Sequence, residues 1–151
     1  MKITFVCTGN TCRSPMAEAY FKHLCEKAGL DVEIGSAGTF AGLGEPASIN
    51  SVQTMAQFNI DLSGFGSTPL TRELIDSSDM IICMTSSHRF QVASMHAAAL
   101  SKTHLLGDFA DASGDIADPY GAPLTVYQDC FAEMKPLLEN LLHRVASKIS
   151  S

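Results

Sequence analysis

Two cysteines, an arginine and a serine are crowded into the segment CTGNTCRS at residues 7–14. Cys7 follows the apolar run ITFV, and Arg13 comes six residues later, directly before Ser14 and Pro15. Ser14 is a favourable helix N-cap, and Pro15 suits a first helical turn because its missing N–H is not needed there. The segment therefore predicts a loop that leads from a strand into the N-terminus of a helix.

A loop at a helix N-terminus is suited to binding an oxyanion. Free backbone N–H groups and the positive end of the helix dipole attract anionic oxygens, and Arg13 adds a planar fork of donors that matches phosphate. Gly9 offers a conformation with little steric restriction, and Asn10 tolerates left-handed geometry. We therefore expect a phosphate-binding loop formed by Thr8, Gly9, Asn10, Thr11, Cys12, Arg13 and Ser14.

Cys7 is expected at the base of this loop, where the helix dipole and Arg13 would lower the pKa of its thiol below the free value of about 8.5. A thiolate that attacks phosphorus would form a phosphocysteine, while the loop amides and Arg13 stabilise the equatorial oxygens. The structural alternative is a buried cysteine beside a glycine loop, with Arg13 on the surface. A Walker-type nucleotide loop is excluded, because the GK[ST] that it requires is absent.

A complete turnover also needs a group that protonates the leaving group and later activates a water, and one carboxyl can do both. Asp118 in GDIADPYGAP is the candidate, since Pro119 and Gly121 hold it in a turn between the last predicted strand and the last predicted helix. A lone DP is commonly just a turn, so the assignment depends on Cys7 and Arg13. The neighbouring acidic residues are interpreted as solvated loop charges: Asp108, Asp111 and Asp115.

The elements that must position these residues alternate between strand and helix. Buried apolar runs predict strands at 2–6, 32–36, 79–84 and 103–106, and helices are predicted at 15–28, 47–58, 71–77, 87–98 and 124–148. We expect an α/β fold, a single three-layer domain over residues 1–151 with a parallel sheet of about four strands, helices on both faces and the phosphate-binding loop after the first strand. Ligands bind beyond the carboxyl ends of such strands.

The composition excludes several classes of protein. A formal net charge of −6 opposes binding to nucleic acid, which depends on neutralising phosphates. No segment approaches the roughly 20 apolar residues that span a bilayer, so no membrane contact and a cytoplasmic location are expected. The five cysteines are odd in number and scattered, which favours free thiols, and Cys25 and Cys130 are interpreted as packing residues. The histidines form no convincing ligand set, so no metal or other cofactor is expected.

The sequence resembles the low-molecular-weight protein tyrosine phosphatase family. CTGNTCRS at 7–14, SAGT at 36–39 and DPYG at 118–121 match family segments in the expected order, and the similarity covers essentially the whole chain. The resemblance implies that Cys7 is the nucleophile, Arg13 the phosphoryl clamp and Asp118 the general acid. It also implies that Asn10 and Ser14 support the loop and the thiolate.

Thr11 bears on the substrate, because tyrosine phosphatases of this family usually carry an aliphatic residue there. The threonine form resembles the bacterial protein-arginine-phosphatase branch, as do STPLTREL at 67–74 and MTSSH at 84–88. A hydroxyl suits a polar guanidinium better than a phenyl ring, so phosphoarginine is favoured over phosphotyrosine in phosphorylated proteins or peptides. Tyr120 and Phe40 are candidate walls of the entrance, and an aromatic wall would also suit phosphotyrosine. The oligomeric state is left open.

The sequence departs from the family pattern in two places, and its phosphate-binding loop contains a second cysteine. The paired tyrosines of many tyrosine-specific relatives are reduced here to Tyr120, and residues 61–70 lack the histidine that often supports the loop; Ser63 or Ser67 could substitute for it. Cys12 could form a reversible disulfide with Cys7 that protects the nucleophile from overoxidation, or it could simply be a packed loop residue.

Two rival functions remain at this point. Thioredoxin-coupled arsenate reductases resemble this fold but pass a disulfide through two further cysteines close in sequence, whereas Cys83 has no such companion because position 90 is Phe90. A non-catalytic module that binds phosphorylated partners would show binding without turnover.

Overall fold

Four short parallel strands form the centre of the computed structural model, which describes residues 1–109 and 114–150. They are β1 (Lys2–Cys7), β2 (Glu33–Gly38), β3 (Met80–Cys83) and β4 (Thr103–Leu105), in the order β2-β1-β3-β4. The register pairs Cys7 with Gly38 and Val6 with Cys83, so three strands finish at the same edge of the sheet. The predicted four-stranded parallel sheet is confirmed, and Cys7 is the last residue of a central strand.

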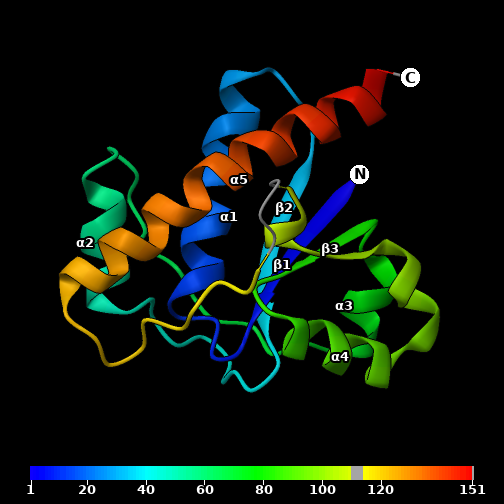
Figure 1. Ribbon diagram of the computed structural model, residues 1–151, viewed down its shortest axis with the longest axis horizontal. Helices are drawn as coiled ribbons and strands as arrows, with labels where there is room; N and C mark the ends of the chain where they lie inside the picture. Colours follow the sequence, from blue (N-terminus) through cyan, green and yellow to red (C-terminus); the bar gives the residue numbers. More distant parts are fainter. Residues whose placement is uncertain (110–113, 151) are drawn as a thin grey trace.

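Helices cover both faces of this sheet (Figure 1). On one face lie α1 (Arg13–Lys27), α2 (Ile49–Ala56) and the long α5 (Leu124–Ser150), and on the other lie α3 (Arg72–Ser77) and α4 (Ser86–Met95). Two short 3-10 helices flank β4, namely η1 (Ala97–Lys102) and η2 (Leu106–Phe109). The chain therefore folds as the three-layer α/β domain that the alternation of apolar segments predicts.

Each face of the sheet has its own apolar core, because successive residues of a strand point to opposite sides. Ile3 and Phe5 of β1 are fully buried in the cluster that includes α1 and α5. Val6 of β1 and Ile81 of β3 belong to the second cluster, together with Val92 of α4. The end of β1 is thus clamped from both sides, which gives the loop after it a rigid base.

Several predicted boundaries differ from the observed ones. The helix predicted at 87–98 ends at Met95 and is followed by the separate 3-10 helix η1, and the helix predicted at 47–58 covers Ile49–Ala56. Ser14 is not the N-cap of α1: the helix begins at Arg13, with Cys12 in the cap position. In the described part of the chain, no helix is both long and apolar enough to cross a bilayer.

Candidate active site

The loop after β1 curls from Cys7 back to the start of α1. Its left-handed residue is Asn10, with φ of 55°, as the sequence predicts for an asparagine there. Gly9 has no left-handed φ, so the freedom expected of that glycine is not what turns the loop. In the sheet, β2 lies on one side of β1 and β3 on the other, so the chain changes sides at β1. A loop at such a topological switch point faces the crevice where ligands of open α/β sheets bind.

The sulfur of Cys7 is buried and lies 2.8 Å from Oγ of Ser14. Burial raises the pKa of this thiol from its ordinary value, while the Ser14 hydroxyl, the charge of Arg13 and backbone hydrogen bonds from Ser14 and Asn10 lower it. The net direction is upward, so the expectation of a lowered pKa is wrong for this arrangement. Three of the groups that would stabilise a thiolate nevertheless hydrogen bond to the sulfur, namely the Ser14 hydroxyl and the backbone N–H groups of Ser14 and Asn10.

The side chain of Asn10 has a fixed orientation inside the loop. Its Oδ1 accepts from the backbone N–H of Thr68 at 2.8 Å, and because that N–H can only donate, Nδ2 must be the donor end. Nδ2 donates to Ser14 Oγ at 2.7 Å and to Ser36 Oγ at 2.9 Å, and Ser36 donates to Glu18 Oε1 at 2.6 Å. Because Asn10 occupies a lone pair of the Ser14 oxygen, the Ser14 hydrogen is available for donation to a Cys7 thiolate, which can only accept.

Neither of the serines suggested as a substitute for the supporting histidine takes that role. Ser63 hydrogen bonds with Asp61, and Ser67 bonds with the backbone of the loop after β2. Asn10 is instead supported by Ser36 and by the main chain at Thr68. Ser36 belongs to the SAGT segment, so a signal for this support was present in the sequence, although its contact with Asn10 was not predicted.

Arg13 is almost fully buried beside the loop. Its Nη1 donates to the carbonyl of Ile116 at 2.8 Å, and its Nη2 lies 3.6 Å from Oδ2 of Asp118. Its Nε is buried and has no hydrogen-bond partner within the described residues. A buried, unsatisfied guanidinium donor is well suited to an anionic oxygen.

Asp118 lines the same cavity as Cys7 and Arg13, with half of its side chain exposed. Its Oδ1 accepts from the backbone N–H of Tyr120 at 3.1 Å, and the turn is closed by a bond from the N–H of Ala122 to the carbonyl of Pro119. A carboxyl that is held by its own turn and reaches both solvent and Arg13 can exchange protons beside a bound phosphoryl group.

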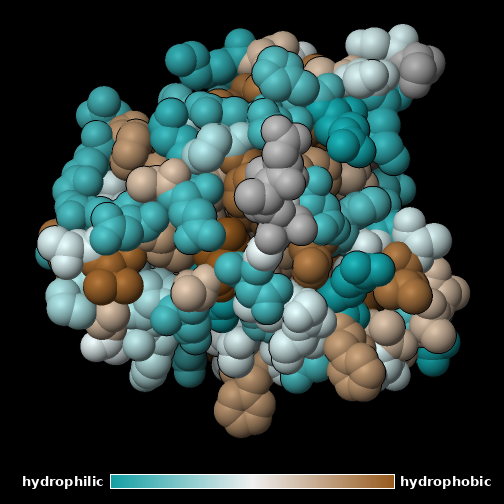
Figure 2. All heavy atoms as spheres, in the orientation of Figure 1, coloured by the Kyte–Doolittle hydropathy of each residue, from teal (hydrophilic) through white to brown (hydrophobic). Residues whose placement is uncertain are grey.

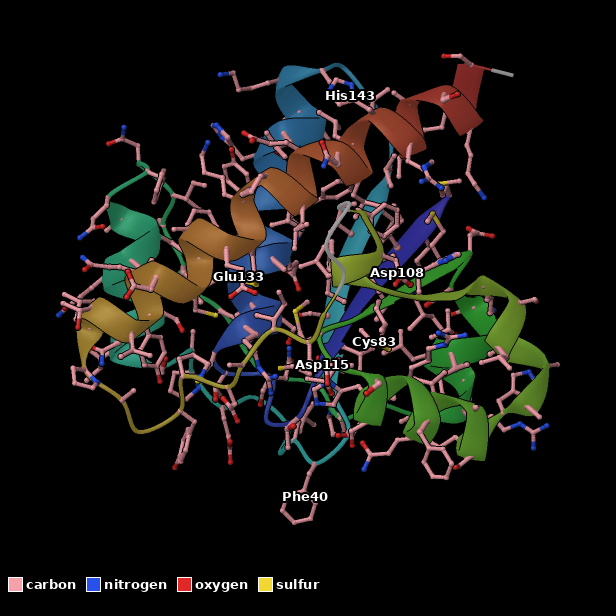
Figure 3. All side chains as sticks on the ribbon, in the orientation of Figure 1. Phe40, Cys83, Asp108, Asp115, Glu133 and His143 are labelled. Atoms are coloured by element: carbon pink, nitrogen blue, oxygen red, sulfur yellow. The ribbon has the colours of Figure 1, made fainter. Side chains whose placement is uncertain are left out.

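The cavity between these groups has a volume of about 410 Å³. It is lined by Cys7, Thr8, Gly9, Thr11, Cys12, Arg13, Phe40, Glu45, Asp118 and Tyr120. Asn10 and Ser14, also predicted for the loop, support it from behind. The rings of Phe40 and Tyr120 are 87% and 77% exposed, so they form an outer rim rather than a packed wall. Figure 3 shows Phe40 projecting away from the molecule, and Figure 2 shows an apolar ring standing out at the same place.

The rim segment after β2 is fastened by Ser67. The Ser67 hydroxyl donates to the carbonyl of Gly42 at 2.6 Å and accepts from the N–H of Glu45 at 2.9 Å. Two main-chain bonds, Ser67 N–H to Glu45 O and Gly44 N–H to Ser67 O, are both 2.8 Å long. This fastening brings Glu45 to the cavity, a position that sequence reasoning missed because Glu45 lies outside every recognised motif.

Two further residues beside the site make contacts that the sequence did not predict. His88 Nε2 lies 2.8 Å from Thr8 Oγ1, a contact across 80 positions that no local pattern predicts. Asp115 is exposed in a loop, as predicted for a solvated charge, and its Oδ1 also accepts from the N–H of Ser86 at 2.9 Å, a contact that was not predicted. Asp108 likewise accepts a bond, from the N–H of Leu105, whereas Asp111 lies outside the described residues.

The remaining cysteines are free thiols in this structure. Cys25 and Cys130 are buried, as expected for packing residues, and Cys83 is fully buried. Cys12 is also buried, with its Sγ 3.3 Å from the hydroxyl of Tyr127. Across residues 1–109 and 114–150, no group of three or more His, Cys, Asp or Glu is placed to hold a metal ion.

Residues 2–151 match the family model described as "Low molecular weight phosphotyrosine protein phosphatase". The chain belongs to this phosphatase family. It is 41% identical to a protein-arginine-phosphatase of Bacillus subtilis, an alignment that spans 93% of this chain and 94% of the relative. It is 34% identical to the low molecular weight protein-tyrosine-phosphatase PtpB of Staphylococcus haemolyticus, over 93% and 97% of the two chains.

A solved structure described as a mutant of YwlE arginine phosphatase with a phosphorylated active site serine has the same fold. Its TM-score with this phosphatase is 0.92 at 39% identity, and the match covers 97% of this chain and 96% of the other. The predicted family and fold class are therefore confirmed, and the family makes the chain an enzyme of the hydrolase class.

Proposed function

We propose that Cys7 is the nucleophile of a phosphatase reaction, that Arg13 and the loop amides bind the phosphoryl group, and that Asp118 is the general acid. The observation that carries this proposal is the shared cavity, which Cys7, Arg13 and Asp118 all line, with a carboxyl oxygen of Asp118 3.6 Å from Nη2 of Arg13. Ser14 and Asn10 act behind the loop, where they orient a hydrogen-bond donor toward the sulfur.

The reaction proceeds in two displacements. The Cys7 thiolate attacks phosphorus, a sulfur–phosphorus bond forms, and the bond from phosphorus to the leaving group breaks while Asp118 gives its proton to the departing atom. Asp118, now a carboxylate, then takes a proton from a water whose oxygen attacks phosphorus, which releases inorganic phosphate and regenerates the thiolate. Arg13 and the loop N–H groups stabilise the charge on the equatorial oxygens in both steps.

The preferred substrate is phosphoarginine in a protein or peptide. Thr11 lines the cavity, where its hydroxyl offers a guanidinium a hydrogen-bond partner that an aliphatic side chain lacks. The relatives named as protein-arginine-phosphatases support this choice, while relatives named as tyrosine phosphatases and the exposed ring of Tyr120 keep phosphotyrosine as the alternative. The cytoplasmic location inferred from the sequence stays a prediction.

The test is the ratio of kcat/KM for phosphoarginine and phosphotyrosine peptides of the same sequence. We expect the wild type to prefer phosphoarginine, and we expect Thr11→Ile to lower the ratio by about tenfold or more, because it removes a hydrogen bond and adds apolar contact. Cys7→Ser serves as the inactive reference. A phosphotyrosine preference that Thr11→Ile leaves unchanged would contradict the arginine assignment, and turnover by Cys7→Ser would contradict the mechanism.

Cys7 and Cys12 are also proposed as a redox pair. Both lie on one tightly curved loop and both line the cavity, so peroxide can reach Cys7 and a second thiol is near to resolve the sulfenic acid. Peroxide should inactivate the wild type reversibly, with full recovery in dithiothreitol. Cys12→Ser should lose activity irreversibly under the same treatment, and equal recovery of the two proteins would argue against the pair.

A further inference from the structure

The segment MTSSH at residues 84–88 joins β3 to α4 and contacts two parts of the site that come from opposite ends of the chain. One contact reaches the phosphate-binding loop, and the other reaches the segment that carries Asp118. The segment does not line the cavity, so its side chains have no part in the chemistry described above. Figure 3 shows Asp115 beside the start of α4, below the end of β3 that is marked by Cys83.

The contact with the phosphate-binding loop has a defined direction. Nδ1 of His88 accepts from the backbone N–H of Thr85 at 3.2 Å, so this nitrogen carries no proton. The hydrogen of the neutral ring is therefore on Nε2, which donates to Thr8 Oγ1 at 2.8 Å. Burial, and to a smaller extent the charge of Arg13, lower the pKa of His88 to about 4, against the opposing effect of the Asp118 and Asp115 carboxylates.

The contacts with the acid segment are equally specific. Both oxygens of Asp115 bind Ser86, Oδ1 to its backbone N–H at 2.9 Å and Oδ2 to its hydroxyl at 3.3 Å. The next residue, Ile116, donates its N–H to the carbonyl of Met84 at 2.8 Å. Asp118 follows two residues later, so the main chain that carries it is tied to the end of β3.

We propose that residues 84–88 are a positioning clamp, which sets the separation between the phosphate-binding loop and Asp118. This proposal rests on the proposed roles of Cys7 and Asp118. His88 fixes the loop through Thr8, and Ser86 fixes the acid segment through Asp115. Arg13 links the two parts directly, since it belongs to the phosphate-binding loop and its Nη1 donates to the carbonyl of Ile116 in the acid segment.

The two halves of the clamp should fail in different ways. Loss of the Asp115 contact displaces the proton donor, which matters for leaving groups that need a proton and hardly matters for those that depart as stable anions. Loss of the His88 contact with Thr8 displaces loop amides that bind the phosphoryl group, which matters for every substrate. A residue that only stabilised the fold would produce neither pattern.

The decisive experiment measures kcat/KM for a series of aryl phosphates whose leaving-group pKa increases, since kcat/KM reports the first displacement. Asp115→Ala should lower it about tenfold for the poorest leaving groups and less than about twofold for the best, because misplacing a general acid forfeits part of its 10²–10⁴-fold contribution. Asp115→Asn, which keeps an acceptor for the Ser86 N–H, should recover part of the loss. Ser87→Ala is the matched control, because this exposed neighbour of Ser86 makes no side-chain hydrogen bond to the described residues.

Thr8→Val tests the other half. It should weaken competitive inhibition by inorganic phosphate about fivefold and lower kcat/KM by a similar factor for every aryl phosphate, because it removes an acceptor from the loop. Thr8→Ser should restore both values, and His88→Gln should add little to the loss in Thr8→Val. Unaltered phosphate inhibition in Thr8→Val, or a uniform loss across the series in Asp115→Ala, would overturn the clamp.

Asp118→Ala separates failure of the clamp from failure of the proposed function. It should show the strongest dependence on the leaving group, since it removes the proton donor itself. A flat response in Asp118→Ala would overturn the acid assignment on which the clamp depends, whereas a steep response there with a flat one in Asp115→Ala would overturn the clamp alone.

Discussion

At the scale of single residues, the site depends on side chains whose hydrogen-bonding direction is forced by a neighbour. A backbone N–H identifies the acceptor end of Asn10, and another identifies the unprotonated nitrogen of His88. These hydrogen bonds hold the Asn10 amide in one orientation and the His88 ring in one tautomer before any substrate binds. Such fixed groups are the condition for electrostatic preorganisation.

His88 should make the stability of the fold depend on pH in a defined window. Its pKa is about 4 in the folded protein and about 6.5 when unfolded, so the unfolded chain binds the extra proton between these values. Stability should therefore fall as the pH decreases from about 6.5 to about 4, by on the order of 2 kcal/mol. Urea midpoints at several pH values measure this, and His88→Gln should show a flatter dependence; parallel curves would contradict the assignment.

Some residue roles were accessible from the sequence and others were not. Cys7, Arg13 and Asn10 lie within eight positions of one another, so spacing and elementary chemistry predicted their shared loop. Ser14 was misjudged as an N-cap, because a sequence cannot show that its hydroxyl is already engaged by Cys7 and Asn10. His88 was overlooked because its partner is 80 positions away, and only tertiary packing brings the two together.

At the scale of elements, the end of β2 is as important to the loop as β1 itself. Gly38 pairs with Cys7 in the sheet, and the N–H groups of Thr39 and Phe40 donate to the carbonyls of Cys7 and Thr8, each at 2.9 Å. A Cβ added at Gly38 would lie 2.4 Å from the carbonyl oxygen of Thr8. The phosphate-binding loop therefore packs directly against the main chain of Gly38, at a distance that only glycine permits.

Gly38→Ala should therefore damage activity. The new methyl group must push the carbonyl of Thr8 aside, and a displacement of about 1 Å in a catalytic loop can lower kcat/KM on the order of 10²-fold. Gly35→Ala in the same strand is the matched control, because a Cβ there meets no atom within 4 Å. Kinetics on an aryl phosphate and thermal unfolding of both variants test this; similar activities would show that the loop tolerates the shift.

Element types were easier to predict than element ends. Within residues 1–109 and 114–150, each of the four strands and five α-helices was placed within a few residues, because apolar runs and helical spacing are local properties of the sequence. The end of α4 was not foreseen, since His96 adopts an extended conformation and the chain continues as η1, a change that the sequence of alanines at 97–99 does not signal.

At the scale of the whole molecule, a parallel sheet gathers the site from segments that are far apart along the chain. Residues 7–14, the rim after β2 and the acid segment meet at the carboxyl edge of the strands, around one cavity. An anion bound there contacts groups that separate completely when the chain unfolds. Binding at this cavity must therefore add to the stability of the entire domain.

Inorganic phosphate or vanadate should raise the melting temperature accordingly. At a ligand concentration of 100 times Kd, the free energy of unfolding should increase by about 2.7 kcal/mol. Arg13→Ala should abolish the increase, because it removes the buried guanidinium from the cradle. Arg72→Ala, at an exposed position of α3, is the control that should keep it. A shift that persists in Arg13→Ala would place the anion elsewhere.

The fastening of the rim by Ser67 has a consequence for protein engineering. Its four bonds end on the backbone of Gly42, Gly44 and Glu45, so the path of that segment is independent of the side chains it displays. Positions 40, 43 and 45 can then be randomised in a library without moving the thiol or its cradle. Selection from such a library would change which target proteins the enzyme recognises and leave the phosphoryl-transfer step unchanged. Recognition and chemistry can therefore evolve separately in this fold.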